Sequence, residues 1–178
     1  MRIEQLNQIM PTAGKRAALF LNALNSAMAE FGITGKLNQA AFLATLAHES
    51  GQLRYMLELA DGTAYEMRKD LGNTWPGDGV RFKGRGVIQI TGRANYAACG
   101  AVLGLDLISN PELLEIPENA CRSAAWFWEV NKLNRWADAG DFDGVSDVVN
   151  RGRKTATASD SNGWADRLAF YTAALKVL

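Results

Sequence analysis

Residues 39–58 read QAAFLATLAHESGQLRYMLE, and the rest of the chain is organised around this stretch. Its first half carries apolar residues on nearly every side of a helix, so we expect a helix that is buried on most of its faces. Asn38 is suited to cap the start of this helix, and Gly51 is suited to end it. The last turn then presents the polar residues 48–50, His-Glu-Ser, at the end of an apolar helix.

Glu49 lies in an unfavourable place for a charged carboxylate. It is near the negative end of the helix dipole and above an apolar helix, and both features favour its neutral form. A carboxylic acid that keeps its proton near neutral pH is what general acid catalysis requires. Glu58 follows beyond the helix end, and two carboxyl groups in such different settings are typical of glycosidic bond hydrolysis. The alternative is that Glu49 is a surface helix residue and Glu58 an ordinary ion-pair partner.

A second informative stretch, residues 81–96, reads RFKGRGVIQITGRANY, and its residues 87–91 are the best candidate for a strand. Alternate side chains of a strand share a face, so the two isoleucines are expected to face the core. Gln89 and Thr91 then lie together on the opposite face, beside glycines that leave the approach open. An amide and a hydroxyl on one open face suit the neutral hydrogen-bonding groups of a sugar. The alternative is a half-exposed strand whose polar residues face solvent.

The remaining chain is mainly helical by its pattern of apolar residues, with one small β element. The aromatic residues 126–128, Trp-Phe-Trp, are expected in the core of a helix and not on a sugar-binding surface. Polar residues 153–163 are expected to form a mobile loop, and residues 73–79 a second loop. The other predicted helices span residues 15–31, 65–71, 95–103, 117–136, 142–149 and 164–178, the last with a buried stripe of Leu168, Tyr171 and Leu175.

Length and charge limit the class of protein. A chain of 178 residues indicates one domain, which can have two lobes. The 19 basic and 19 acidic residues cancel, which argues against nucleic-acid binding and against attraction to anionic membranes. The start, MRIEQLNQIM, is not a signal peptide, and no apolar run reaches the ~20 residues that span a bilayer. We therefore expect a soluble chain without membrane insertion.

Other hydrolytic sites are less consistent with this sequence. A zinc-protease helix needs two histidines, and the chain contains only one, so no metal site is expected. A thiol-based amidase is the alternative from another reaction class, with His48 activating Cys99, because Cys121 falls in a predicted core helix. A third interpretation is a non-catalytic wall-binding module, which would keep the sugar-facing residues without needing Glu49.

The motifs AHESG and KGRGVIQITGRANY, with a glutamate between them, resemble glycoside hydrolase family 19, and in particular its phage and prophage endolysins. The similarity also covers DLGNTWPGDGVRFKGRG, SAAWFW and the final RLAFY. It implies a mainly α-helical, lysozyme-like fold with two lobes and a cleft between them. It also implies a single catalytic domain over residues 1–178, without a separate wall-binding domain.

The resemblance implies roles for individual side chains. Glu49 is the general acid, Glu58 is the base that activates water, and Thr91 positions that water. Residues that match substrate-contacting or organising positions of the family are Gln89, Asn95, Asn150 and Arg167, of which Arg167 organises the carboxylates. The chain departs from the family pattern at Arg151, which follows Asn150 where a glycine is usual, and in the longer polar stretch 153–163.

The resulting expectation is an endolysin that cleaves the β-1,4 bonds of peptidoglycan with inversion and lyses a host cell. Chitin, the substrate of the plant branch of the family, is the alternative. No cofactor is expected, and the enzyme is expected to act as a monomer on peptidoglycan glycan strands. Family analogy places it in the host bacterial cytoplasm until a pore-forming holin releases it to the periplasm and cell wall.

Overall fold

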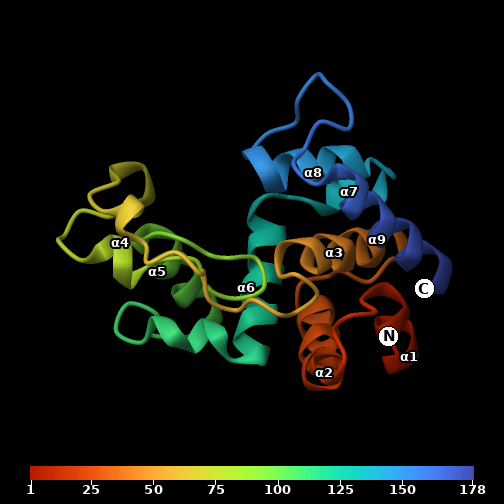
Figure 1. Ribbon diagram of the computed structural model, residues 1–178, viewed down its shortest axis with the longest axis horizontal. Coiled ribbons are helices and arrows are strands. Elements are labelled where there is room, and N and C mark those ends of the chain that lie inside the picture. Colours follow the sequence, from red (N-terminus) through yellow and green to blue (C-terminus); the bar gives the residue numbers. More distant parts are fainter.

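Nine α-helices and three short 3₁₀ helices build the fold in the computed structural model, which describes residues 1–178 (Figure 1). None of the helices is both long and apolar enough to cross a lipid bilayer. The α-helices are α1 (Ile3–Ile9), α2 (Lys15–Glu30), α3 (Lys36–Glu49), α4 (Asp78–Arg81), α5 (Arg93–Leu103), α6 (Pro117–Val130), α7 (Asn134–Asp138), α8 (Phe142–Arg151) and α9 (Trp164–Val177), and the 3₁₀ helices are η1 (Thr63–Tyr65), η2 (Lys69–Leu71) and η3 (Pro111–Glu115).

Helix α3 is the central element, as its sequence predicts. Every residue from Ala40 to Ala47 is buried, and helices α1, α7, α8 and α9 all pack against α3. Gly51 ends the helix in the left-handed region, with φ of +57°, as expected. The predicted cap was wrong: Gly35 is the N-cap residue and the helix begins at Lys36, so Asn38 lies inside it and donates to Asp138 at 2.9 Å.

Two lobes are visible on either side of α6 (Figure 1). The larger lobe contains α1–α3 and α7–α9, and the smaller one contains α4 and α5. Each lobe has its own hydrophobic core, and Trp126 on α6 belongs to the core of the smaller lobe while Trp128 belongs to the larger. The aromatic segment of α6 therefore joins the two cores, which confirms its predicted burial for both tryptophans.

The predicted strand over residues 87–91 was wrong. Residues 86–89 form a turn, and only isolated β-bridges flank it, from Arg85 to Leu57 and from Arg85 to Ile90. Gly86 and Gln89 adopt left-handed backbone angles, which a strand does not tolerate. Val87 and Ile90 are buried while Ile88 is only half-buried, so the spacing of the core residues is three and not two. These two isolated bridges are all that the structure has of the predicted small β element, and the side chains of residues 87–91 do not alternate between faces.

Other element boundaries also differ from the sequence prediction. The predicted helix 117–136 is interrupted where Lys132 adopts a left-handed φ of +53°, so α6 and α7 are separate. The predicted helix 65–71 is replaced by η1 and η2, and helices α1 and α4 were not anticipated. On α9 the buried stripe is Arg167, Tyr171 and Ala174, whereas Leu168 is 40% exposed.

Candidate active site

Glu49 occupies the last position of α3, where the helix meets the first turn of α9. Its Oε1 accepts a hydrogen bond from Arg167 Nη2 at 2.5 Å, and the Arg167 side chain is only 2% exposed. The preceding residue, His48, places Nδ1 2.6 Å from Asp166 Oδ2. Two consecutive residues of α3 are thus bound by two consecutive residues of α9, which fixes the orientation of the carboxyl group.

Arg167 brings a positive charge next to Glu49 that the pattern of apolar residues in α3 alone does not predict. The guanidinium of Arg167 places a buried cation directly against the Glu49 carboxyl group, in addition to the apolar helix beneath it. In a reaction in which Glu49 gives up a proton, the same guanidinium stabilises the carboxylate that remains. The Arg167 Nη1 atom is buried without a hydrogen-bond partner, so both N–H groups of this nitrogen remain unused.

Glu58 is held by donors from the smaller lobe. Its Oε1 accepts a hydrogen bond from the Tyr65 hydroxyl at 2.8 Å, and its Oε2 accepts one from Gly84 N at 2.9 Å. The bond to Glu58, together with partial burial, raises the pKa of the Tyr65 phenol, so Tyr65 remains a donor at neutral pH. Each carboxylate oxygen of Glu58 therefore has one fixed, uncharged donor.

Gly84 provides the space that this arrangement requires. A Cβ atom at this position would lie 3.1 Å from Glu58 Oε2 and 2.8 Å from Gln89 Oε1. Any larger residue would displace one or both side chains. The same measurement shows that the Gln89 amide and the Glu58 carboxylate converge on one glycine, as residues of a common site must.

Gln89, Thr91 and Asn95 line one hollow of about 360 Å³, whose opposite wall includes residues of α6. The Thr91 hydroxyl donates to Gln89 O at 2.9 Å, and the Asn95 amide donates to Thr91 O at 2.8 Å. This wall consists of Trp126, Phe127 and Val130 of α6 and of Asn131, which directly follows the helix. Residues expected to share a strand face are therefore brought together by a turn and the start of α5 instead, and the oxygen of Thr91 keeps lone pairs that can accept from a water molecule.

Asn150 is connected to Arg167, and so to Glu49, through the backbone of Asn162. It ends α8 with Arg151, and its Oδ1 accepts a hydrogen bond from Asn162 N at 3.1 Å. Arg167 Nε donates to the carbonyl of the same Asn162 at 2.9 Å. Asn150 and Arg167, both named by the resemblance, thus bind opposite sides of one residue.

Two contributors to this arrangement, Tyr65 and Gly84, were missed from the sequence. Gly84 is among the glycines expected to leave the approach to the supposed strand open, but its spacing to Glu58 carries no local signal. Tyr65 lies seven positions after Glu58, where only the observed turn brings the two together.

The thiol-based alternative has no support in the structure. Cys99 and Cys121 are both fully buried, and burial raises the pKa of Cys99 to about 12 and that of Cys121 as well. Cys99 lies in the core of the smaller lobe, whereas the imidazole of His48 contacts Asp166 in the first turn of α9. A thiolate nucleophile activated by His48 is not formed.

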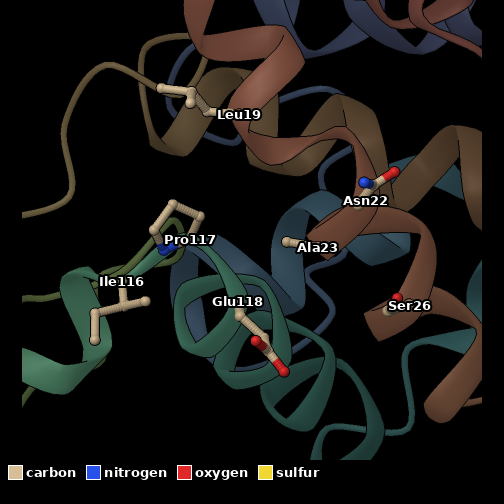
Figure 2. Close-up of a pocket in the computed structure, with 7 residues that line it drawn as sticks. All are labelled: Leu19, Asn22, Ala23, Ser26, Ile116, Pro117 and Glu118. Atoms are coloured by element: carbon tan, nitrogen blue, oxygen red, sulfur yellow. The ribbon is translucent and has the colours of Figure 1, made fainter.

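The other hollow of the molecule, about 420 Å³, lies between α2 and the start of α6 (Figure 2). Its only charged lining residue is Glu118, and none of the expected site residues lines it. Neither hollow is lined by Glu49 or Glu58, and only the smaller one is lined by Gln89, Thr91 and Asn95.

Comparisons with known proteins agree with this geometry. A family model described as chitinase class I, of glycoside hydrolase family 19, matches residues 15–139. The chain belongs to glycoside hydrolase family 19. Endochitinase 4 of Solanum tuberosum is 30% identical over 188 residues, and the match covers 85% of this chain and 62% of that protein. An endochitinase of Arabidopsis thaliana is 38% identical over 119 residues, covering 63% of this chain and 39% of that protein.

Solved structures of the family share its architecture. Chitinase C from Streptomyces griseus superposes with a TM-score of 0.75 at 27% identity, covering 99% of this chain and 75% of that one. A class IV chitinase from Zea mays gives a TM-score of 0.71 at 27% identity, covering 97% of this chain and 91% of that one. The mainly helical, lysozyme-like fold is therefore that of family 19 chitinases, while the chain spans less than two thirds of the length of the two curated relatives named above.

Proposed function

We propose that this family 19 glycosidase hydrolyses β-1,4 bonds of N-acetylglucosamine-containing glycans with inversion, using Glu49 as acid and Glu58 as base. The observation that carries the proposal is the contrasting support of the two carboxyl groups. Glu49 is bound by a buried cation, and Glu58 is bound by two uncharged donors. Glu58 also converges with Gln89 on Gly84, and Gln89 lines the hollow with Thr91 and Asn95.

The reaction uses each group in one step. Glu49 protonates the glycosidic oxygen as the bond to the anomeric carbon breaks, and Arg167 stabilises the resulting carboxylate. Glu58 takes a proton from a water molecule, whose oxygen attacks the opposite face of the same carbon. The Thr91 hydroxyl helps to aim this water. An inverting pair leaves room for the water when its carboxyl groups are about 6.5–9.5 Å apart.

Chitin is the substrate that the comparisons support best, because the named relatives and solved structures are chitinases. This favours the alternative from the sequence over the expected attack on peptidoglycan. Peptidoglycan remains a second candidate because the AHESG and KGRGVIQITGRANY motifs resemble endolysins. Both polymers contain β-1,4-linked N-acetylglucosamine, so one arrangement of Glu49, Glu58 and Thr91 serves either. Host lysis with release by a holin belongs to the second candidate alone.

Mass spectrometry of digests of colloidal chitin and of purified peptidoglycan tests the proposal. Soluble N-acetylglucosamine oligomers from chitin support the first candidate, and muropeptides with a hydrated reducing end support the second. Glu49→Gln should abolish either product. Anhydro sugar ends would indicate a lytic transglycosylase, and free stem peptides would indicate an amidase. Either of these outcomes, or no product from either polymer, contradicts hydrolysis by this carboxylate pair.

A further inference from the structure

The loop between α8 and α9, residues 152–163, is tied to α8 by its polar groups. Lys154 Nζ lies 2.7 Å from Asp143 Oδ2, and Thr155 N donates to the buried Asp147 at 2.9 Å. The sequence predicts a mobile loop here, whereas the structure shows a loop anchored along the preceding helix.

Arg151 fastens the far end of this loop. Its Nη1 lies 2.6 Å from Asp160 Oδ2, and its Nη2 donates to the Asp160 carbonyl at 2.5 Å. We call these two contacts the Arg151–Asp160 clamp. Arg151 holds the pKa of Asp160 below its ordinary value of 3.8. Above pH 3.8 Asp160 is therefore ionised and the clamp is intact. The clamp is lost as the pH falls through the lowered pKa that Asp160 has in the folded protein.

From the clamp, a short chain of hydrogen bonds leads to Glu49. Asn162, two residues after Asp160, donates its N–H to Asn150 and accepts from Arg167 Nε through its carbonyl. Arg167 Nη2 in turn donates to Glu49 Oε1. The Asn162 peptide groups are thus bound on one side by α8 and on the other by the guanidinium that orients Glu49.

The next residue, Gly163, packs directly on the end of α3. A Cβ atom at Gly163 would lie 2.2 Å from Cε1 of His48, and its φ of +70° is also unfavourable for other residues. Because the loop fits this closely against His48, which precedes Glu49, a shift of the loop cannot be absorbed by empty space.

We propose that Arg151 and Asp160 are positioning residues for Glu49, acting through Asn162 and Arg167. The inference deepens the proposed function, on which it rests. It also gives a role to the one position, 151, at which the chain departs from the glycine that the family resemblance leads us to expect. Instead of a flexible glycine, this chain uses an ion pair to hold the loop that orients Arg167.

The two side chains of the clamp are 33% and 31% exposed, and ion pairs of this kind contribute little to overall stability. Asp160→Ala should therefore leave the melting temperature close to that of the parent, whereas Arg151→Ala also removes the 4.0 Å contact with Oδ1 of the buried Asp147 and should lower it slightly. Misplacement of a catalytic group by ~1 Å can cost about a hundredfold in rate. We expect Arg151→Ala to loosen the positioning of Arg167 and Glu49 only in part. Its kcat should fall roughly tenfold, and its KM should change by less than about twofold.

The matched control is Arg153→Ala, which removes the same charge from the same segment at an exposed residue with no ion pair. It should keep the kcat of the parent. Arg151→Lys retains the charge but cannot reproduce both contacts, so its kcat should be intermediate. The double variant Arg151→Ala/Asp160→Ala should lose less than the sum of the two single losses, because both single changes remove the same ion pair.

A second readout does not depend on turnover. The Arg167 Nε–H resonance in ¹⁵N NMR spectra should shift or broaden in Arg151→Ala and stay unchanged in Arg153→Ala. If the parent cleaves no glycan, the proposed function fails, while this resonance still tests the clamp. Equal kcat values for the Arg151 and Arg153 variants, additive losses in the double variant, or an unchanged Arg167 resonance in Arg151→Ala would each overturn the inference.

Discussion

The two carboxyl groups of the site are held in opposite ways. Glu49 ends a buried helix and is bound by Arg167, which lies 118 positions away in the chain. Glu58 lies in an irregular segment and is bound by Tyr65 and Gly84, which lie 7 and 26 positions away. The acid side is therefore assembled from both ends of the chain, and the base side from one contiguous region.

This difference matches the two chemical tasks. A group that becomes a carboxylate during the reaction is stabilised by a fixed cation. A carboxylate that must accept a proton from water, such as Glu58, needs a fixed orientation. Neutral hydrogen-bond donors provide that orientation without forming an ion pair. Variants that remove the acidic proton of Glu49 should therefore act differently from variants that only disturb the orientation of Glu58 and its water.

The largest effect is expected on the acid side, for Glu49→Gln. Glutamine keeps the size of the side chain and its contact with Arg167 but has no proton to give, and general acid catalysis supplies about 10²–10⁴-fold in rate. Turnover of soluble glycan and the melting temperature should be measured together, with Glu118→Gln as a control outside the site. Undiminished turnover by Glu49→Gln at an unchanged melting temperature would remove Glu49 from its role.

The next effect is expected on the base side, for Thr91. Thr91→Val removes the hydroxyl that is expected to aim the water, and we expect a loss in kcat of about a hundredfold with little change in KM. Thr91→Ser keeps the oxygen and its bond to Gln89 O, so most of the activity should survive. If the valine variant matches the serine variant in kcat, the hydroxyl does not take part.

A smaller effect is expected for Tyr65→Phe, which removes one of the two donors to Glu58. Gly84 N remains as the other donor, so we expect kcat to fall about tenfold, in line with a hydrogen bond of about 1.5–3 kcal/mol to a charged group. Tyr171→Phe is the matched control, since Tyr171 stacks on Phe142 in the core of the larger lobe. A Tyr65→Phe enzyme with parental kcat would show that Gly84 alone holds the base.

The smallest effect is expected for the thiols. Because both cysteines are buried with raised pKa values, Cys99→Ser should keep activity within a few fold of the parent, apart from any loss of stability. A thiol-blocking reagent should likewise leave turnover intact. Abolished activity in either experiment would restore the thiol-based alternative and set aside the comparison of the two carboxyl groups.

The sequence predicted those parts of the site that depend on the spacing of apolar residues and glycines within one short segment. The burial of α3 and its end at Gly51 follow from apolar spacing and one glycine, which together place Glu49 at a helix end. The turn at residues 86–89 was taken for a strand, because a short apolar run between glycines has the same pattern in either structure.

What the sequence could not provide are contacts set by tertiary structure. Tyr65 reaches Glu58 only because the chain turns between them, and Asp160 meets Arg151 only because the loop folds back on α8. Neither pair has a spacing that predicts contact. Arg167 was anticipated through the family resemblance alone, since an arginine in the first turn of a helix indicates nothing about a partner 118 positions away.

The anomeric configuration of the first product tests the central claim most directly. A soluble β-1,4-linked N-acetylglucosamine oligomer is hydrolysed in an NMR tube, and the new reducing end is observed before it mutarotates. If Glu58 activates water on the face opposite the bond that Glu49 protonates, the product appears first as the α anomer. A product that appears first as the β anomer would mean that the configuration is retained, and it would contradict the account of these two carboxyl groups.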